Sequence, residues 1–165
     1  SNLTILDENK KERVIALKDF YKGYKTYDLK EGELIKNIDF KLPSEKTFFN
    51  FEKVCKRTHL DIASVNTAIQ IVVDENKVTE AHVSIGGVAA IPKYLTETSQ
   101  FLKGKGIDTK LIIEAGEILQ KEISPISDVR GTSDYKRLLA RQLFYAHFIA
   151  LSPEKYPLKN LLQHA

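Results

Sequence analysis

The chain has 165 residues, of which 42% are hydrophobic and 28% are charged, and its formal net charge is +3. This length corresponds to one ordinary domain or to one domain with a piece of another, and the hydrophobic content is sufficient for a packed core. A mainly disordered chain is excluded, and no apolar run approaches the roughly 20 residues of a membrane-spanning helix. Because the basic residues are spread evenly along the chain, the sequence gives no indication of nucleic-acid binding.

The chain contains one cysteine, Cys55, and no methionine. A single cysteine forms neither an intrachain disulfide nor a cysteine metal cluster. Together with the absence of a secretory leader pattern, this favours a cytoplasmic protein. Since no initiator methionine is present, we interpret Ser1-Asn2 as a tag remnant and the chain as a piece of a longer protein. The alternative is a natural N-terminus from which the methionine was removed.

The N-terminal part of the chain predicts short strands. Apolar runs at 3–6 and 14–17 flank a polar turn and predict a hairpin with a loop longer than two residues. The aromatic-rich segment 19–29 predicts a loop or a short helix. Apolar and polar residues alternate over 33–43, which predicts a strand that a proline ends.

Three more strands follow the predicted linker at 43–46. Alternating patterns cover 47–56, 65–73 and 78–86, and the last two runs flank four polar residues, which predicts an antiparallel hairpin. One face of the first run either packs in the core or meets a ligand; it carries Phe49, Phe51, Lys53 and Cys55.

The remaining chain predicts helices over 95–102, over 109–123 and from Thr132 or Ser133 to 151, with Asp108 as the N-cap of the second. Strands followed by helices favour an α+β fold. We therefore expect a three-stranded antiparallel sheet that the C-terminal helices cover on one face.

No catalytic set is visible in these elements. The four histidines are too far apart along the chain to assemble a metal site at helix or strand spacing; they are His59, His82, His147 and His164. Cys55 lies near two lysines and is either a thiol of lowered pKa or a small core residue. Lys53 either extends its charge to solvent from an apolar face or binds a phosphate or ring oxygen of a ligand. No glycine-rich phosphate loop is present.

Five short motifs, in order, carry a resemblance to a known family. The three longest are Phe51-Glu-Lys53-Val-Cys-Lys-Arg57-Thr-His-Leu-Asp61-Ile-Ala63, Ser84-Ile-Gly-Gly87-Val-Ala and Pro125-Ile-Ser-Asp128-Val-Arg130-Gly-Thr-Ser-Asp-Tyr135-Lys-Arg137. Two shorter runs, Phe20–Thr26 and Glu31–Ile35, precede them. Over residues 3–151 the chain resembles the FAD-binding subunit of molybdenum hydroxylases, of the xanthine dehydrogenase and carbon monoxide dehydrogenase kind.

This resemblance implies three segments. Residues 1–43 correspond to the C-terminal part of a FAD-binding domain, residues 47–151 to the C-terminal domain of the carbon monoxide dehydrogenase flavoprotein, and residues 152–165 to a tail. In this family FAD passes electrons from iron–sulfur clusters to NAD or another acceptor. The 2Fe–2S and molybdenum cofactors lie on other domains or subunits.

The resemblance also implies two flavin contacts, Ile35 and Lys53, and a loop over 54–64 that moves over the flavin in some relatives. His59-Leu60 depart from the acidic residues of that loop. Because the glycine-rich pyrophosphate loops of the family are not in this chain, we expect it to be inactive alone and to hold little FAD. The alternatives are a non-catalytic assembly or interaction domain with the same fold and a free-standing small-molecule binding domain.

Overall fold

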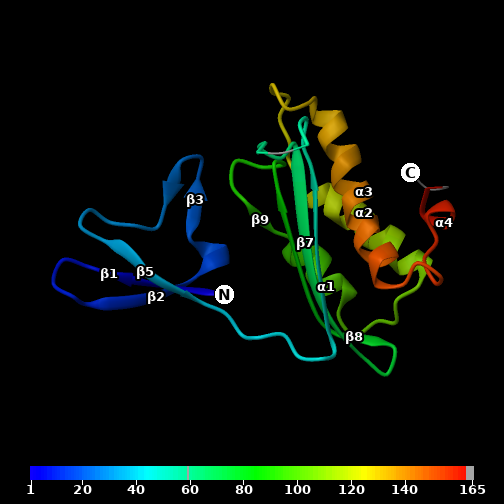
Figure 1. Cartoon of the computed structure of the whole chain (residues 1–165), viewed down its shortest axis with the longest axis horizontal. Helices are drawn as coiled ribbons and strands as arrows, with labels where there is room; N and C mark the ends of the chain where they lie inside the picture. Colours follow the sequence, from blue (N-terminus) through cyan, green and yellow to red (C-terminus); the bar gives the residue numbers. More distant parts are fainter. Residues whose placement is uncertain (59, 163–165) are drawn as a thin grey trace. The chain divides into compact units, whose positions relative to one another are not determined.

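The computed structural model describes residues 1–58 and 60–162 of the chain (Figure 1). The chain forms two compact units, one over residues 1–44 and one from residue 45 onward. We call them the N-terminal unit and the C-terminal unit and describe each by itself.

The N-terminal unit contains a small antiparallel sheet. Its strands are ordered β2-β1-β5, and their bounds are β1 (Asn2–Leu6), β2 (Glu12–Ala16) and β5 (Leu34–Asp39). The segment predicted as a loop or a short helix instead forms the 3-10 turn η1 (Leu17–Asp19) and a second hairpin, β3 (Tyr21–Gly23) and β4 (Thr26–Tyr27). The aromatic side chains explain the hairpin, because the Phe20 ring stacks on that of Tyr27 with 5.8 Å between centroids.

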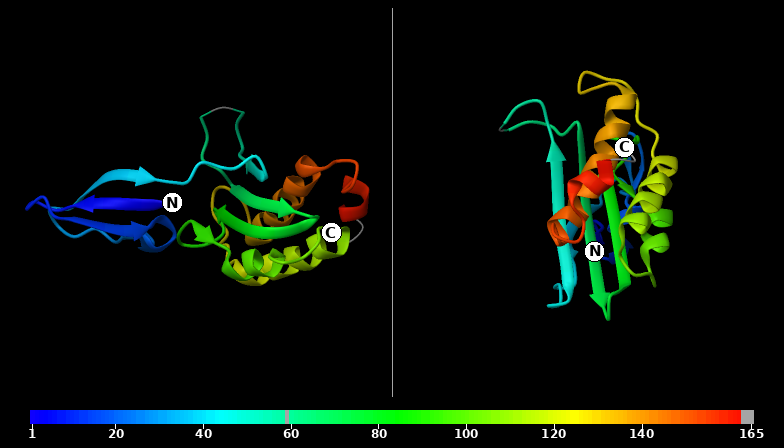
Figure 2. Two further views of the ribbon diagram at one scale, coloured as in Figure 1. Left: turned by 90° about the horizontal axis from the view of Figure 1, so that it is seen from below. Right: turned by 90° about the vertical axis from the view of Figure 1, so that its right-hand side faces the viewer.

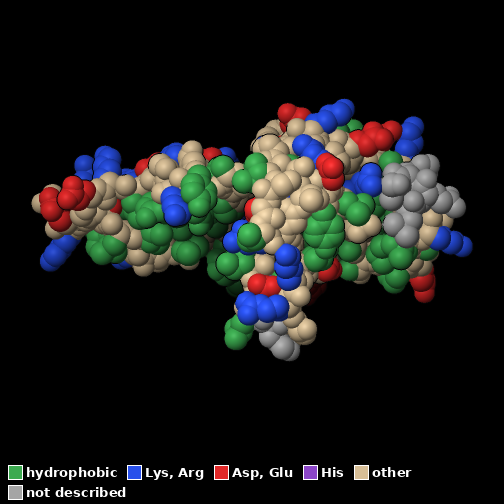
Figure 3. Space-filling model, turned by 90° about the horizontal axis from the view of Figure 1, so that it is seen from above, with side chains coloured by type: hydrophobic (Ala, Val, Ile, Leu, Met, Phe, Trp, Pro, Cys, Tyr) green, Lys and Arg blue, Asp and Glu red, His purple; other side chains and the backbone are tan. Residues whose placement is uncertain are grey.

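The core of the N-terminal unit is small. Leu3, Ile5 and Phe20 are buried, whereas β5 is exposed along its whole length. Hydrophobic side chains therefore gather on the surface of this unit (Figure 3). An ion pair closes the turn before β5, because Arg13 Nη2 lies 2.7 Å from Glu33 Oε2. The hydrogen bond from Arg13 lowers the pKa of Glu33 to about 2.

The C-terminal unit contains a four-stranded antiparallel sheet ordered β6-β7-β8-β9. The strands are β6 (Thr47–Val54), β7 (Val65–Asp74), β8 (Lys77–Gly86) and β9 (Lys93–Tyr94). The three long strands were predicted. The fourth was not, because its two residues are too short to produce an alternating pattern.

Helices cover one face of this sheet (Figure 2). They are α1 (Thr96–Leu102), α2 (Thr109–Glu122), α3 (Ser133–Leu151) and α4 (Leu158–Leu162). The Asp108 carboxylate accepts a hydrogen bond from Leu111 N at 2.7 Å, as expected of an N-cap, and Thr132 caps α3 in the same way. None of the described helices is both long and apolar enough to cross a membrane. The α+β prediction is confirmed.

The core lies between the sheet and the helices. The alternation of β7 and β8 turns one set of side chains toward the helical layer, which confirms the predicted faces; this set includes Val65, Ile69, Ile71, Val83 and Ile85. The segment after α3 differs from the expected tail. Tyr156 and Leu161 are buried in the same core, and Tyr156 donates a hydrogen bond to Ile107 O at 3.0 Å.

Candidate functional site

The outer face of the sheet, away from the helices, carries the aromatic residues of β6. Phe49 and Phe51 are 61% and 53% exposed, so this face does not pack in the core of its unit. Phe48 and Val54 pack against the core instead, because their side chains point to the opposite face of β6. The exposure of Phe49 and Phe51 rules out the packed alternative that the sequence left open, and the ligand alternative stays a prediction.

Lys53 extends the same face toward the loop that follows β6. Its Nζ atom donates a hydrogen bond to Asp61 O at 2.7 Å. The Asp61 carboxylate accepts bonds from Arg57 N at 2.8 Å and from Ile62 N at 2.9 Å, and the backbone bond from Arg57 is the main cause of its lowered pKa. Arg57 Nη2 also lies 3.4 Å from Asp61 Oδ1. The Asp61 carboxylate therefore holds the backbone of the loop after β6, and the Asp61 carbonyl oxygen positions the ammonium of Lys53.

Ile35 belongs to the N-terminal unit. It lies on β5 opposite Ile5 of β1 and is 40% exposed. The pairing of β5 with β1 positions the backbone at Ile35, while its own side chain stays accessible.

Asp128 organises the loop before α3. The Arg130 guanidinium is 3.4 Å from its carboxylate, but Lys136 Nζ is closer, at 2.8 Å. Lys136 is buried and also donates to Ile126 O at 2.9 Å. Its bond is the first cause of the lowered pKa of Asp128. The sequence analysis missed Lys136, although a lysine beside the apolar stripe of a helix is a signal for a buried ion pair.

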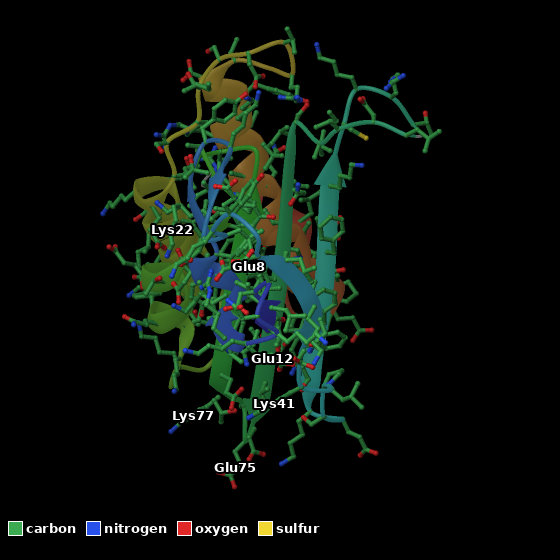
Figure 4. All side chains as sticks on the ribbon, turned by 90° about the vertical axis from the view of Figure 1, so that its left-hand side faces the viewer. Glu8, Glu12, Lys22, Lys41, Glu75 and Lys77 are labelled. Carbon is green, nitrogen blue, oxygen red and sulfur yellow. The ribbon has the colours of Figure 1, made fainter. Side chains whose placement is uncertain are left out.

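The loops that carry the matched motifs meet at one end of the sheet (Figure 2). Lys56 Nζ donates to Val129 O at 2.5 Å, and Ser64 Oγ donates to Arg130 O at 2.9 Å. Gly87, directly after β8, contacts the backbone of Ser64. The β7–β8 turn, with Glu75 and Lys77, forms the opposite end of the sheet (Figure 4). Three motifs that are 20 to 40 residues apart therefore build one local structure.

Exposed hydrophobic side chains mark the surface of this end. They are Leu60 at 99%, Ile62 at 68%, Ile126 at 73% and Val129 at 83% exposure. The loop after β6 projects from the C-terminal unit with hydrophobic and basic side chains on it (Figure 3). Several large apolar side chains exposed together are typical of a surface that another protein or a ligand covers.

The remaining candidates have ordinary structural roles. Cys55 Sγ lies 3.0 Å from Arg57 O within the loop. His82 is exposed and lies 2.8 Å from the Tyr94 hydroxyl, and His147 is buried between β6, β7 and α3. His59 and His164 lie outside the described residues. Among the residues that the structure describes, no group of side chains could hold a metal ion.

These features define an α+β domain whose helices cover one face of an antiparallel sheet and whose motif-bearing loops converge at one end. A family model, the CO dehydrogenase flavoprotein C-terminal domain, matches residues 51–151. The chain belongs to this family, which confirms the resemblance seen in the sequence.

Relatives with known names agree with this assignment. The xanthine dehydrogenase of Oryza sativa subsp. japonica is 28% identical over 158 residues, which are 91% of this chain and 11% of that protein. The glyceraldehyde dehydrogenase medium chain of Sulfolobus acidocaldarius is 30% identical over 140 residues, 84% of this chain and 49% of that one. The structure of reconstituted CO dehydrogenase from Oligotropha carboxidovorans shares the fold, with a TM-score of 0.81 and 21% identity over 94% of this chain and 52% of that one. This chain thus spans half or less of the length of the xanthine dehydrogenase and of the glyceraldehyde dehydrogenase medium chain.

Proposed function

We propose that this chain is part of the FAD-binding subunit of a xanthine dehydrogenase-like molybdenum hydroxylase. Such an oxidoreductase passes electrons from iron–sulfur clusters through FAD to an acceptor such as NAD. The observation that carries the proposal is the convergence of the loops after β6, after β8 and before α3 at one end of the sheet, next to Lys53.

The residues on the outer face of the C-terminal unit fit one edge of a flavin. Lys53 offers an ammonium whose position is set by Asp61 O, and Phe51 offers an exposed ring on the same face. A cation next to a polar ring edge favours negative charge there. When bound, the flavin supplies the electron-accepting and electron-donating group. Ile35, exposed on β5, is the second proposed contact, an apolar surface for the ring.

The partners proposed are the iron–sulfur and molybdopterin domains or subunits of the same enzyme. A 2Fe–2S cluster takes four cysteine ligands, and this chain has only Cys55, so the cluster belongs to another domain or subunit. The exposed apolar side chains at the loop end of the sheet are the proposed contact surface. The compartment proposed is the cytoplasm, where a free thiol such as that of Cys55 stays reduced.

Replacing Lys53 by alanine in the complete enzyme is expected to slow flavin reduction or reoxidation by about tenfold, the effect of losing one charge-assisted hydrogen bond. Because the Lys53 side chain is exposed, the free energy of unfolding should change by only about 1 kcal/mol or less. Stopped-flow measurement of flavin absorbance gives the two rates directly.

Lys46 provides the matched control. It lies just before the other end of β6 and forms an exposed pair with Asp74 at 2.8 Å, so Lys46→Ala removes an equal charge far from the loop end of the sheet. Lys53→Arg should restore part of the rate because it keeps the charge. If Lys53→Ala and Lys46→Ala give the same flavin kinetics as the unchanged enzyme, Lys53 has only a structural role and the assembly-domain alternative gains support.

The 165-residue chain by itself is expected to be colourless and inactive. Tight FAD binding requires pyrophosphate contacts, and two separate contacts such as Ile35 and Lys53 cannot offset the loss of translational freedom on binding. Absorbance between 350 and 500 nm after purification with added FAD tests this expectation. One equivalent of bound flavin would contradict it.

A further inference from the structure

A groove between α2 and α3 lies on the helical layer of the C-terminal unit. It has a volume of about 320 Å³ and is lined by residues of both helices. Ile113, Gly116 and the ring of Tyr145 form its apolar part, while Arg141 and Lys121 contribute positive charge. Its size is at the lower end of the range for small-molecule sites. None of its residues belongs to the loop end of the sheet or to the proposed flavin contacts.

Arg141 has a donor that the protein does not use. Its Nε atom is buried without a hydrogen-bond partner, and within the described part of the chain no hydrogen bond or ion pair involves its guanidinium. One turn earlier on α3, Arg137 has partners within the chain, because it donates to Gln120 O at 2.8 Å and to Ile123 O at 3.1 Å. A buried N–H without a partner is costly, so the Nε–H of Arg141 is a donor open to a partner from outside the chain.

The opposite wall of the groove is built by a close contact. A Cβ atom on Gly116 would lie 2.9 Å from Cε1 and 3.0 Å from the hydroxyl oxygen of Tyr145, so only glycine lets this ring lie against α2. Burial raises the pKa of the Tyr145 hydroxyl, which therefore stays protonated and can donate a hydrogen bond. A hydroxyl donor thus lies in the same groove as the guanidinium.

We propose that this groove binds a small monocarboxylate with a planar apolar body. The guanidinium fork of Arg141 matches a carboxylate, and Lys121 adds a second positive charge. The side chain of Ile113 contacts the apolar body, and the Tyr145 hydroxyl donates to the carboxylate. Glu117 lines the same groove and repels a second negative group, which favours one carboxylate over a dicarboxylate or a phosphate dianion.

The proposal is tested with benzoate and its neutral isostere benzamide on the 165-residue chain labelled with ¹⁵N. Benzoate is expected to shift the amide signals of the facing turns of α2 and α3 saturably, and at least tenfold more tightly than benzamide. Inorganic phosphate should bind at least tenfold more weakly than benzoate.

Variants assign the effect to named side chains. Arg141→Gln should weaken benzoate binding at least tenfold, and Tyr145→Phe should weaken it by a smaller factor, while both keep the dispersed spectrum of the folded chain. Lys110→Gln removes one charge from an exposed position on α2 outside the groove and should leave the affinity unchanged. Equal shifts with benzoate and benzamide, tighter binding of phosphate, shifts scattered over the surface, or wild-type affinity in Arg141→Gln would each overturn the proposal. The benzoate and benzamide comparison needs no variant, so a variant that fails to fold does not remove the test.

Discussion

Replacing Gly87 by alanine is expected to lower the free energy of unfolding of the C-terminal unit by about 3 kcal/mol, the sum of backbone strain and overpacking. The φ angle of Gly87 is +85°, a region that alanine enters only with strain. In addition, an alanine Cβ would lie 2.3 Å from Ser64 O, and a backbone oxygen cannot move aside as a flexible side chain can. The substitution should therefore displace the junction where the loops meet.

Urea unfolding followed by circular dichroism at 222 nm measures this change, because the α-helices of the described chain all lie in the C-terminal unit. Gly104→Ala is the matched control. Gly104 has a similar φ of +81°, but no atom lies within 4 Å of its added Cβ, so it should lose only about 1 kcal/mol. Equal losses in the two variants would show that strain alone matters and that the contact with Ser64 does not.

Acidification from pH 7.5 to pH 5 is expected to lower the free energy of unfolding by about 2 kcal/mol through His147. Asn50 Nδ2 donates to His147 Nδ1 at 3.0 Å, and the Nε2 atom lies 2.7 Å from Thr67 Oγ1, which fits a neutral ring protonated at Nε2. Burial lowers the pKa of His147 to about 4. A second proton would place Nδ1–H against the Asn50 amide N–H groups.

The direction of this change in the free energy of unfolding follows from proton uptake by the unfolded chain. Between pH 6.5, the ordinary pKa of histidine, and pH 4, the unfolded chain binds a proton that the folded chain does not, so stability rises with pH in this window and is lost as the pH falls. In His147→Gln, which can still hydrogen-bond, stability at pH 7.5 should be lower, but the slope between pH 7.5 and pH 5 should largely disappear. His82→Gln changes an exposed histidine and should keep the slope. A slope that survives in His147→Gln would assign it to other groups.

The sequence predicted the fold of the C-terminal unit well because its elements have clear periods. The alternation of β7 and β8 and the apolar stripe of α2 each match a buried face, and Asp108 caps α2 as its position suggested. Prediction from the sequence failed for segments whose structure depends on contacts with distant residues. The hairpin of β3 and β4 depends on the stacking of Phe20 on Tyr27, and β9 depends on pairing with β8.

The candidate site was predictable only in part. Lys53 stood out because a lysine interrupts an apolar alternating face. The ion pair of Lys136 with Asp128 was not predicted, because Asp128 lies in a loop whose path the sequence does not define. Likewise, no pattern along the chain relates Gly87 to Ser64, because their contact exists only after β8 has paired with β7 in register.

The exposed aromatic strand β6 has a consequence for the handling of the protein. In the sheet of the C-terminal unit, β6 pairs only with β7 among the described strands, so one row of its backbone N–H and C=O groups faces outward. The run Thr47-Phe-Phe-Asn-Phe51 along this edge has high β propensity and contains no charge or proline, the composition of segments that nucleate cross-β aggregates. Lys46 and Lys53 flank the run and act as charged gatekeepers at its two ends. Any molecule that covers this strand would therefore also protect the chain against self-association.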